Sequence, residues 1–304
     1  KIDNCTFVSE EVDGADDIGG DFSFVGMVEG IRFGKDSSVS YDHGEGSSKA
    51  GGAISITNCD FMGKHTLVTG FERGWIYLSS SLRCPSVKVS GCNFVGDVLG
   101  VDGGDGWPLD VEEQPGACIT NNADISLLVS NCQFHSYSQG IKLSAGDNSI
   151  KSCVFEVVQE AILIKDFYDY SLFDSVGGKI DSKLVAKIDD CNFLDFPTST
   201  TSGSAGFAAI KLNGTNENTL TGAASYVDIK NCSFEDYRNA IDLTELSALM
   251  AGEEDGVQYS HINISSCTFK DIKHEVVKTN SNGVNSKLHN ASAGTSQVLR
   301  WGVR

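Results

Sequence analysis

The chain has 304 residues, 40% of them hydrophobic, which is enough to bury a large core. Its formal net charge of -18 argues against nucleic acid and anionic membrane surfaces as partners, because both repel an acidic chain. No apolar run is long enough to cross a membrane, so we expect no direct membrane insertion. The chain opens inside a repeat and without an initiator Met, which predicts that it is a piece of a longer protein or a processed product.

A six-residue unit recurs along the chain: Ile or Val, two residues, Cys, one residue and Phe. Regular self-similarity of this kind is the signature of a repeat architecture. The copies are Ile2–Phe7, Ile56–Phe61, Val89–Phe94, Val129–Phe134, Ile150–Phe155, Ile188–Phe193, Ile229–Phe234 and Ile264–Phe269.

The spacing inside the unit predicts a strand, a two-residue corner and a second strand. Val227 and Ile229 lie two apart, as do Cys232 and Phe234, so each pair faces one side of a strand. The step of three from Ile229 to Cys232 breaks the alternation, so the chain must turn there. The residue before each Cys accepts left-handed backbone angles, Gly and Asn most readily. In chain order it is Asn4, Asn58, Gly91, Asn131, Ser152, Asp190, Asn231 and Ser266.

A third strand is predicted seven residues after the Phe, at Ile141, Ile162, Ile241 and Val276, with displaced versions at 31–33, 76–78 and 210–212. Three short strands per repeat predict an all-β right-handed parallel β-helix of about eight three-strand rungs, with long loops on one face. The alternative, an antiparallel sandwich, gives no reason to keep one corner throughout. We expect a single domain over residues 1–278, followed by a cap, irregular turn or linker over 279–304.

Eight of the ten cysteines occupy the same repeat position. Stacked from rung to rung, their sulfurs lack the offset geometry of a disulfide, so we predict an inward column of buried free thiols. Cys118 is predicted to fill an Ile position on the third strand. No Cys/His cluster in the sequence has the spacing of a zinc site.

Long insertions occur at the two corners before and after the third strand, whereas the Asn corner never lengthens. Loops on one face of a rigid scaffold commonly carry function, so the outward residues of the third strand become the floor of a candidate site. They are predicted to be Arg32, Tyr77, Ile119, Lys142, Leu163, Lys211, Asp242 and Val277.

The three-strand rungs and the Asn-favouring two-residue corner resemble the pectate-lyase-like superfamily of right-handed β-helices, over residues 1–278. The resemblance implies cleavage of acidic polysaccharides in the groove beside the third strand, by clustered acids and a basic Arg or Lys. Lys142, Lys211 and Asp242 are the nearest candidates for catalytic residues, and we expect Lys211 and Asp242 to form a cross-strand ion pair. No two carboxylates are clearly held at the separation that glycoside hydrolysis requires, which favours a non-catalytic chain.

A second, local resemblance points to passive surface proteins. Gly51-Gly52-Ala53-Ile54, followed by Asn58-Cys59-Asp60-Phe61, is similar to the repeats of the polymorphic outer membrane proteins, a family of surface adhesins.

Acidic turns supply the candidate ligands for calcium, with a solvated acidic surface as the alternative; no other cofactor is expected. The turns contain Asp13, Asp16 and Asp17, and Asp102 and Asp105. Among the glycosylation sequons, Asn213 and Asn290 are predicted to lie in loops and are better acceptors than Asn4 and Asn231 at tight corners.

These patterns favour an extracellular or cell-surface β-helix with a structural or adhesive role. Its expected partners are other protein subunits or surface glycans, with assembly into a larger fibre or surface layer. Contacts are expected from Arg32 and Tyr77 and from the loop aromatics Trp107, Tyr168 and Tyr170, because aromatic rings suit both sugar faces and protein contacts. In such a module Lys142 and Lys211 are expected to be solvated. The alternative is a polysaccharide lyase or glycoside hydrolase acting on acidic glycans.

Overall fold

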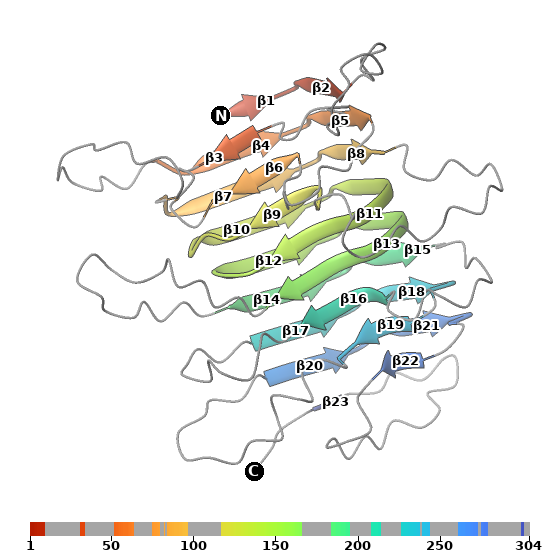
Figure 1. Ribbon diagram of the computed structural model, residues 1–304. Helices are drawn as coiled ribbons and strands as arrows, with labels where there is room; N and C mark the ends of the chain where they lie inside the picture. Colours follow the sequence, from red (N-terminus) through yellow and green to blue (C-terminus); the bar gives the residue numbers. More distant parts are fainter. Residues whose placement is uncertain are drawn as a thin grey trace, which may run out of the picture.

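The computed structural model shows a right-handed parallel β-helix, as the repeat predicted (Figure 1). Every regular element among the described residues is a β-strand. The structure describes residues 1–9, 31–33, 52–63, 75–79, 82, 84–96, 117–165, 184–194, 208–213, 226–237, 239–243, 261–272, 275–278 and 299–300.

Sheet A contains the strands that precede the Asn corner, each beside the equivalent strand of the next rung. Its last pair, β20 and β23, is antiparallel, and the other pairs are parallel. Its order is β1 (Ile2–Asp3), β4 (Ile54–Thr57), β7 (Ser86–Ser90), β10 (Ser126–Ser130), β12 (Asp147–Lys151), β14 (Val185–Asp189), β17 (Tyr226–Lys230), β20 (His261–Ser265) and β23 (Leu299–Arg300).

The strands after the corner form a second sheet with two arms, which the long curved strands β11 (Gln133–Leu143) and β13 (Val154–Lys165) join (Figure 1). Three parallel faces, sheet A and the two arms, therefore enclose the core. Arm B contains β2 (Thr6–Ser9), β5 (Asp60–Gly63), β8 (Asn93–Val95), the first parts of β11 and β13, β15 (Asn192–Leu194), β18 (Ser233–Glu235) and β21 (Thr268–Lys270). Arm C contains the third strands: β3 (Ile31–Phe33), β6 (Ile76–Leu78), β9 (Ile119–Asn121), the last parts of β11 and β13, β16 (Ala208–Asn213), β19 (Asn239–Asp242) and β22 (Glu275–Lys278).

The two-residue corner has the same backbone conformation in every copy. All eight residues before the cysteines are left-handed, with φ between 52° and 63°. Their backbone N–H groups bridge rungs: Asn131 N donates to Lys151 O at 3.1 Å, and Gly91 N donates to Ser130 O at 3.0 Å. The predicted fixed corner is confirmed, and it explains the preference for residues that tolerate a positive φ.

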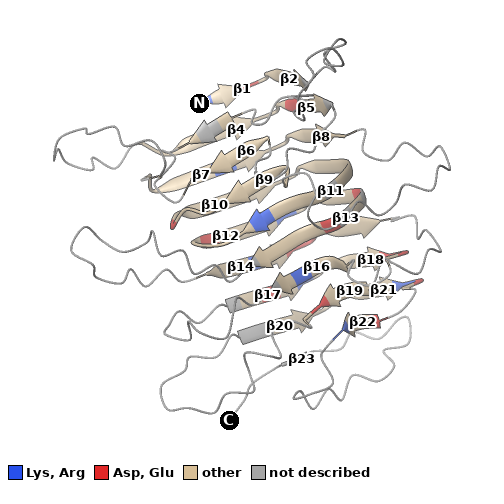
Figure 2. Ribbon diagram, in the orientation of Figure 1, with Lys and Arg blue, Asp and Glu red and all other residues tan. Residues whose placement is uncertain are grey.

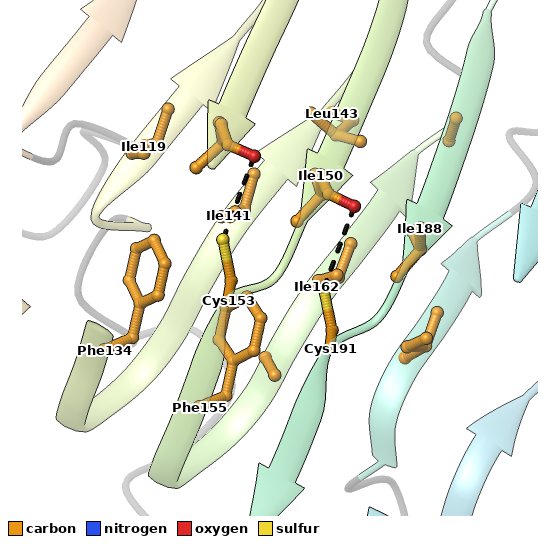
Figure 3. Packing of buried hydrophobic residues seen from close by; sticks show 14 of the residues in the cluster. Ile119, Phe134, Ile141, Leu143, Ile150, Cys153, Phe155, Ile162, Ile188 and Cys191 are labelled. Atoms are coloured by element: carbon orange, nitrogen blue, oxygen red, sulfur yellow. Dashed lines mark hydrogen bonds between the residues drawn. The ribbon is translucent and has the colours of Figure 1, made fainter. Parts of the chain in front are cut away.

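The phenylalanines of the repeat stack into one column that runs from Phe7 to Phe269. Neighbouring ring centroids lie 4.7–5.1 Å apart, and the ring planes differ by at most 11°. Aliphatic residues such as Ile141, Ile150 and Ile162 pack beside these rings (Figure 3). Fully burying a Phe side chain stabilises a fold by about 1.5–3 kcal/mol, so the column is a large part of what holds the rungs together.

The cysteines form a second inward column, as predicted. From Cys59 to Cys267 the cysteines of the unit are at most 5% exposed, and every cysteine is free. Each thiol of the unit donates to the carbonyl oxygen two residues earlier, at 3.1–3.6 Å. The thiols of Cys153 and Cys191 also point at carbonyl oxygens of the preceding rung (Figure 3). A small apolar residue that can also donate a weak hydrogen bond suits this corner, which is a physical reason for Cys at this position.

The expected place of Cys118 is wrong by one residue. Ile119 pairs in register with Ile141, so Cys118 lies level with Gly140 rather than with an Ile. A Cβ built on Gly140 would meet the Ala161 carbonyl oxygen at 2.5 Å, so this inner bend is tight. The buried thiol of Cys118 fills a position for small side chains, and burial raises its pKa.

Candidate functional site: the outer face of the third strands

The outward residues of arm C form a single column, here called the outer column, because the register carries each one to the next strand. The column consists of Arg32, Tyr77, Thr120, Lys142, Leu163, Lys211, Asp242 and Lys278. Six of these positions were predicted. Ile119 and Val277 were expected here, but they lie in the inward column with Ile141 and Ile241. A shift of one residue exchanges the two faces of a strand, which is why both errors reversed the side-chain direction.

The middle of the outer column is buried, although the sequence predicted that Lys142 and Lys211 are solvated. Lys142 is 4% exposed, Asp242 3% and Leu163 6%. The expectation that Lys142 is solvated is therefore wrong, and Lys211 keeps 20% of its side chain exposed. Charged groups removed from water require charged or hydrogen-bonding partners.

Such partners form two neighbouring groups on arm C, here together called the acid–lysine cluster: Gln139, Glu160 and Lys211 in one, and Asp242 and Lys278 in the other. Lys211 Nζ lies 3.4 Å from Glu160 Oε1, and Gln139 Nε2 donates to Glu160 Oε2 at 3.0 Å. Lys278 Nζ lies 3.4 Å from Asp242 Oδ2. Basic and acidic residues alternate down the strands of this face (Figure 2). Each buried carboxylate of the cluster therefore has a lysine as its counter-ion.

Glu160 is the member of the cluster that sequence reasoning missed. It precedes Ile162 by two residues, so simple alternation would direct it inward. At the bend between the arms, however, Ala161 and Ile162 both belong to the hydrophobic core. This break in alternation turns Glu160 toward Lys211, and an acidic residue directly before the Ala-Ile pair was the signal available in the sequence.

Burial raises the pKa of the Glu160 carboxyl above its ordinary value of 4.5. The charge of Lys211 and the hydrogen bonds from Lys211 and Gln139 oppose that rise, while the nearby charge of Asp242 adds to it. Desolvation is the largest of these effects, so Glu160 holds its proton more tightly than an exposed glutamate. A carboxyl of this kind beside a second carboxylate is the arrangement that general acid catalysis uses, and it also occurs in structural ion-pair networks.

Two hydroxyl groups near Lys142, Thr120 Oγ1 and Ser144 Oγ, are buried and have no hydrogen-bond partner among the described residues. Thr120 is the register partner of Lys142, and Ser144 follows Lys142 by two residues. Nearby, Asn122 Nδ2 donates to the Tyr77 hydroxyl at 3.2 Å. Buried hydroxyls of this kind are normally satisfied, so water or the hydroxyl groups of a ligand would complete them.

The structure places the remaining predicted residues unevenly. Tyr77 is half-buried in the outer column, and Arg32 lies on β3 with only its backbone described. Asn213 ends β16, and its side chain is likewise not described. The predictions for Trp107, Tyr168, Tyr170, Asn290 and the calcium candidates Asp13, Asp16, Asp17, Asp102 and Asp105 fall outside the described residues.

The described part of the chain has neither a metal-binding cluster nor a membrane-spanning helix. It contains no group of three or more His, Cys, Asp or Glu side chains arranged to hold a metal ion. It also contains no helix with the length and apolar character needed to cross a membrane.

Comparison with known proteins gives no relative: no family model, no curated protein and no solved structure matches this chain significantly.

Proposed function

We propose that this chain is a non-catalytic structural or adhesive module of an extracellular or cell-surface protein, built on a β-helix of the pectate-lyase-like kind. The observation that carries the proposal is the state of the two carboxylates best placed for catalysis. Glu160 is 5% exposed and Asp242 3% exposed, and each is held by a lysine. A catalytic acid must reach substrate, whereas a buried and neutralised carboxylate serves the packing of neighbouring rungs.

The stacked core supports the same proposal. Ring stacking continues from Phe7 to Phe269, so each rung packs on the next along the whole described ladder. A solenoid whose repeats contact their neighbours in this way is a stiff rod that can carry contact surfaces. Its partners would be other protein subunits or surface glycans, bound through Arg32, Tyr77, Trp107, Tyr168 and Tyr170.

A binding measurement on immobilised glycans and on candidate surface proteins tests the adhesive role. We expect the parent to bind and the replacements Trp107→Ala and Tyr168→Ala to weaken binding, because aromatic rings make the contacts. Val95→Ala, at a half-buried position on arm B, serves as the control. Unchanged binding in both aromatic variants would remove these residues from the proposal.

The second candidate is a lyase or hydrolase acting on acidic polysaccharides. The observation in its favour is the raised pKa of Glu160 with Asp242 close enough to contribute to it. Incubation with polygalacturonate and other acidic glycans, followed by assays for reducing ends and unsaturated products, separates the two functions. The structural proposal expects no turnover. Turnover that disappears in Glu160→Gln and in the double variant Lys211→Ala with Asp242→Ala, but survives in Glu156→Gln, would establish the enzyme instead.

A further inference from the structure

Sheet A has an accessible outer surface that the acid–lysine cluster does not use. On β14, Ala186 and Ile188 are buried in the core, while Lys187 is exposed and Asp189 half-buried on the other side. The parallel register aligns the outward residues of successive strands in columns, two of which contain the alternating charges described below. A third column beside them contains Ser86, Ser126, Asp147 and Val185. The first column is Ser55, Lys88, Leu128, Ser149, Lys187, Asp228 and Asn263; the second is Thr57, Ser90, Ser130, Lys151, Asp189, Lys230 and Ser265.

Charges on this surface are arranged as a chequerboard. Lys187 lies opposite Asp228, and Asp189 lies opposite Lys230. Along β14 the order is Lys then Asp, and along β17 it is Asp then Lys. No strand from β4 to β20 places charges of the same sign in both columns. A partner surface that carries the same two columns in exchanged order therefore places an unlike charge or a neutral group opposite each charge, strand by strand.

The surface also differs from the rest of the molecule in net charge. The two columns hold more lysines than aspartates, whereas the whole chain has a net charge of -18. The lysines are Lys88, Lys151, Lys187 and Lys230, and the aspartates are Asp189 and Asp228. Two copies of so acidic a chain repel each other over most of their surface, and this repulsion is weaker where the two columns of one copy face those of another.

We propose that the outer face of sheet A binds a second copy of this chain, with the two β-helices side by side and pointing the same way. A twofold axis parallel to the β-helix axis makes the strands of the two facing sheets run in opposite directions. When this axis lies between the two columns, the first column of one copy faces the second column of the other. Lys187 then meets Asp189 of the partner subunit, and Asp228 meets Lys230 of the partner subunit.

The rung spacing identifies a second copy as the occupant. Rows of charge separated by roughly 4.8 Å remain aligned over the whole face only against a surface with the same spacing. A copy of the chain has that spacing by construction, and a twofold axis makes each favourable contact twice. The proposal goes beyond the proposed function, because a β-helix enzyme with this face would pair in the same way.

The area of the outer face of sheet A determines how strongly we expect the two copies to associate. Seven strands of about five residues cover roughly 550 Å² per copy, which is near the lower limit for specific association. Contacts within one copy compete with this association. Lys187 Nζ lies 3.5 Å from Asp147 Oδ1, and Lys230 Nζ lies 3.8 Å from Asp228 Oδ2, whose side chain is 15% exposed. Asp228 Oδ1 also accepts from Asn263 Nδ2 at 2.7 Å, and Asp189 Oδ1 accepts from Asn231 Nδ2 at 2.8 Å. We therefore expect a weak dimer that dissociates as salt screens the charges.

Sedimentation of the parent protein tests the proposal directly. Analytical ultracentrifugation over a concentration series should show a monomer–dimer equilibrium at low salt that shifts at least tenfold toward monomer at high salt. A parent that remains monomeric at low salt and at the highest concentration overturns the proposal, and so does a dimer that salt does not weaken. This measurement requires no variant and is sufficient by itself to decide whether the parent protein dimerises.

A charge exchange then locates the interface. The double variant Lys187→Glu with Lys230→Glu makes the central four residues acidic, and Asp189→Lys with Asp228→Lys makes them basic. We expect each variant alone to be monomeric and their equimolar mixture to dimerise. Glu156→Lys and Lys270→Glu, single changes at exposed positions of arm B, are the controls and should leave the parent equilibrium unchanged. Dimers that persist in both double variants, or a mixture that stays monomeric, would place the interface elsewhere.

Discussion

Lys211 and Glu160 form an ion pair across two neighbouring strands, with Lys211 Nζ 3.4 Å from Glu160 Oε1. The register places Asp242 opposite Lys211 on the other side, as expected from the repeat. Lys211 nevertheless reaches back toward β13, where burial makes an unpaired Glu160 carboxylate unfavourable. Lys211 thus serves as the counter-ion of the buried Glu160 carboxylate and is not simply a solvated surface lysine.

The pH dependence of stability should reveal the buried Glu160. Its folded-state pKa is raised, so its contribution to stability is greatest below the unfolded-state pKa and is lost as pH rises through the folded-state pKa. Glu160→Gln keeps the shape of the side chain but never ionises. The variant should match the parent in acid and become the more stable protein as pH increases, measured by urea denaturation over a pH series.

Glu156→Gln is the matched control for this experiment, because Glu156 lies on the same strand and is exposed. Its stability should follow the parent at every pH. A Glu160→Gln variant that is less stable than the parent at neutral pH would show that the ion pair with Lys211 outweighs the cost of burial.

The core column should be far more sensitive to substitution than the surface beside it. Phe234 is 1% exposed and stacks on Phe193 and Phe269, so Phe234→Ala should cost about 3–5 kcal/mol. Lys230 lies on the same repeat with 43% of its side chain exposed, and Lys230→Ala should stay within about 0.5 kcal/mol. Equal losses in chemical denaturation would contradict the assignment of the two faces.

Much of the fold was available from the sequence because one geometric constraint recurs. A step of three between Ile229 and Cys232 requires a turn in every copy, and the left-handed angles at Asn231 and its equivalents confirm it. The sequence was weaker at the second bend, where no fixed residue marks the turn. There Gly140 and Ile141, or Ala161 and Ile162, both belong inside, so counting by alternation misplaced Cys118 and Ile119 and gave no reason to select Glu160.

The burial of the outer column could not be predicted from the repeat. The alternation of side chains along a strand predicts the face to which Lys142 and Asp242 point, but it does not predict what packs against that face of the sheet. A lysine and an aspartate at outward positions are normally solvated, so their low exposure depends on tertiary packing rather than on local pattern. The predicted side of the strand was therefore right for both residues, and the predicted solvation was wrong for Lys142.

Thiol labelling should separate two classes of cysteine. Cys5 is exposed and Cys84 is half-buried, whereas the other eight cysteines are buried. We expect Ellman's reagent to modify Cys5 rapidly and Cys84 more slowly, because burial raises the pKa of the Cys84 thiol. The remaining thiols should react only after denaturation. Rapid labelling of more than two thiols in the folded protein would mean that the rungs open readily.

The Asn corner offers the most direct test of how this sequence specifies its fold. Gly91 occupies the corner with φ of 63°, and a Cβ built there would meet the Asn58 side-chain oxygen Oδ1 at 2.7 Å. Gly91→Ala should therefore cost about 1–2 kcal/mol, since alanine in left-handed backbone is strained and Asn58 must move. Gly91→Asn places at this corner the residue that four other copies use. Asn tolerates the angle, so this variant should be clearly more stable than Gly91→Ala although its side chain is larger. Urea denaturation of the two variants beside the parent measures the difference. If the alanine variant equals or exceeds the asparagine variant, backbone conformation is not what selects the corner residue, and the side-chain contacts between successive corners must take its place.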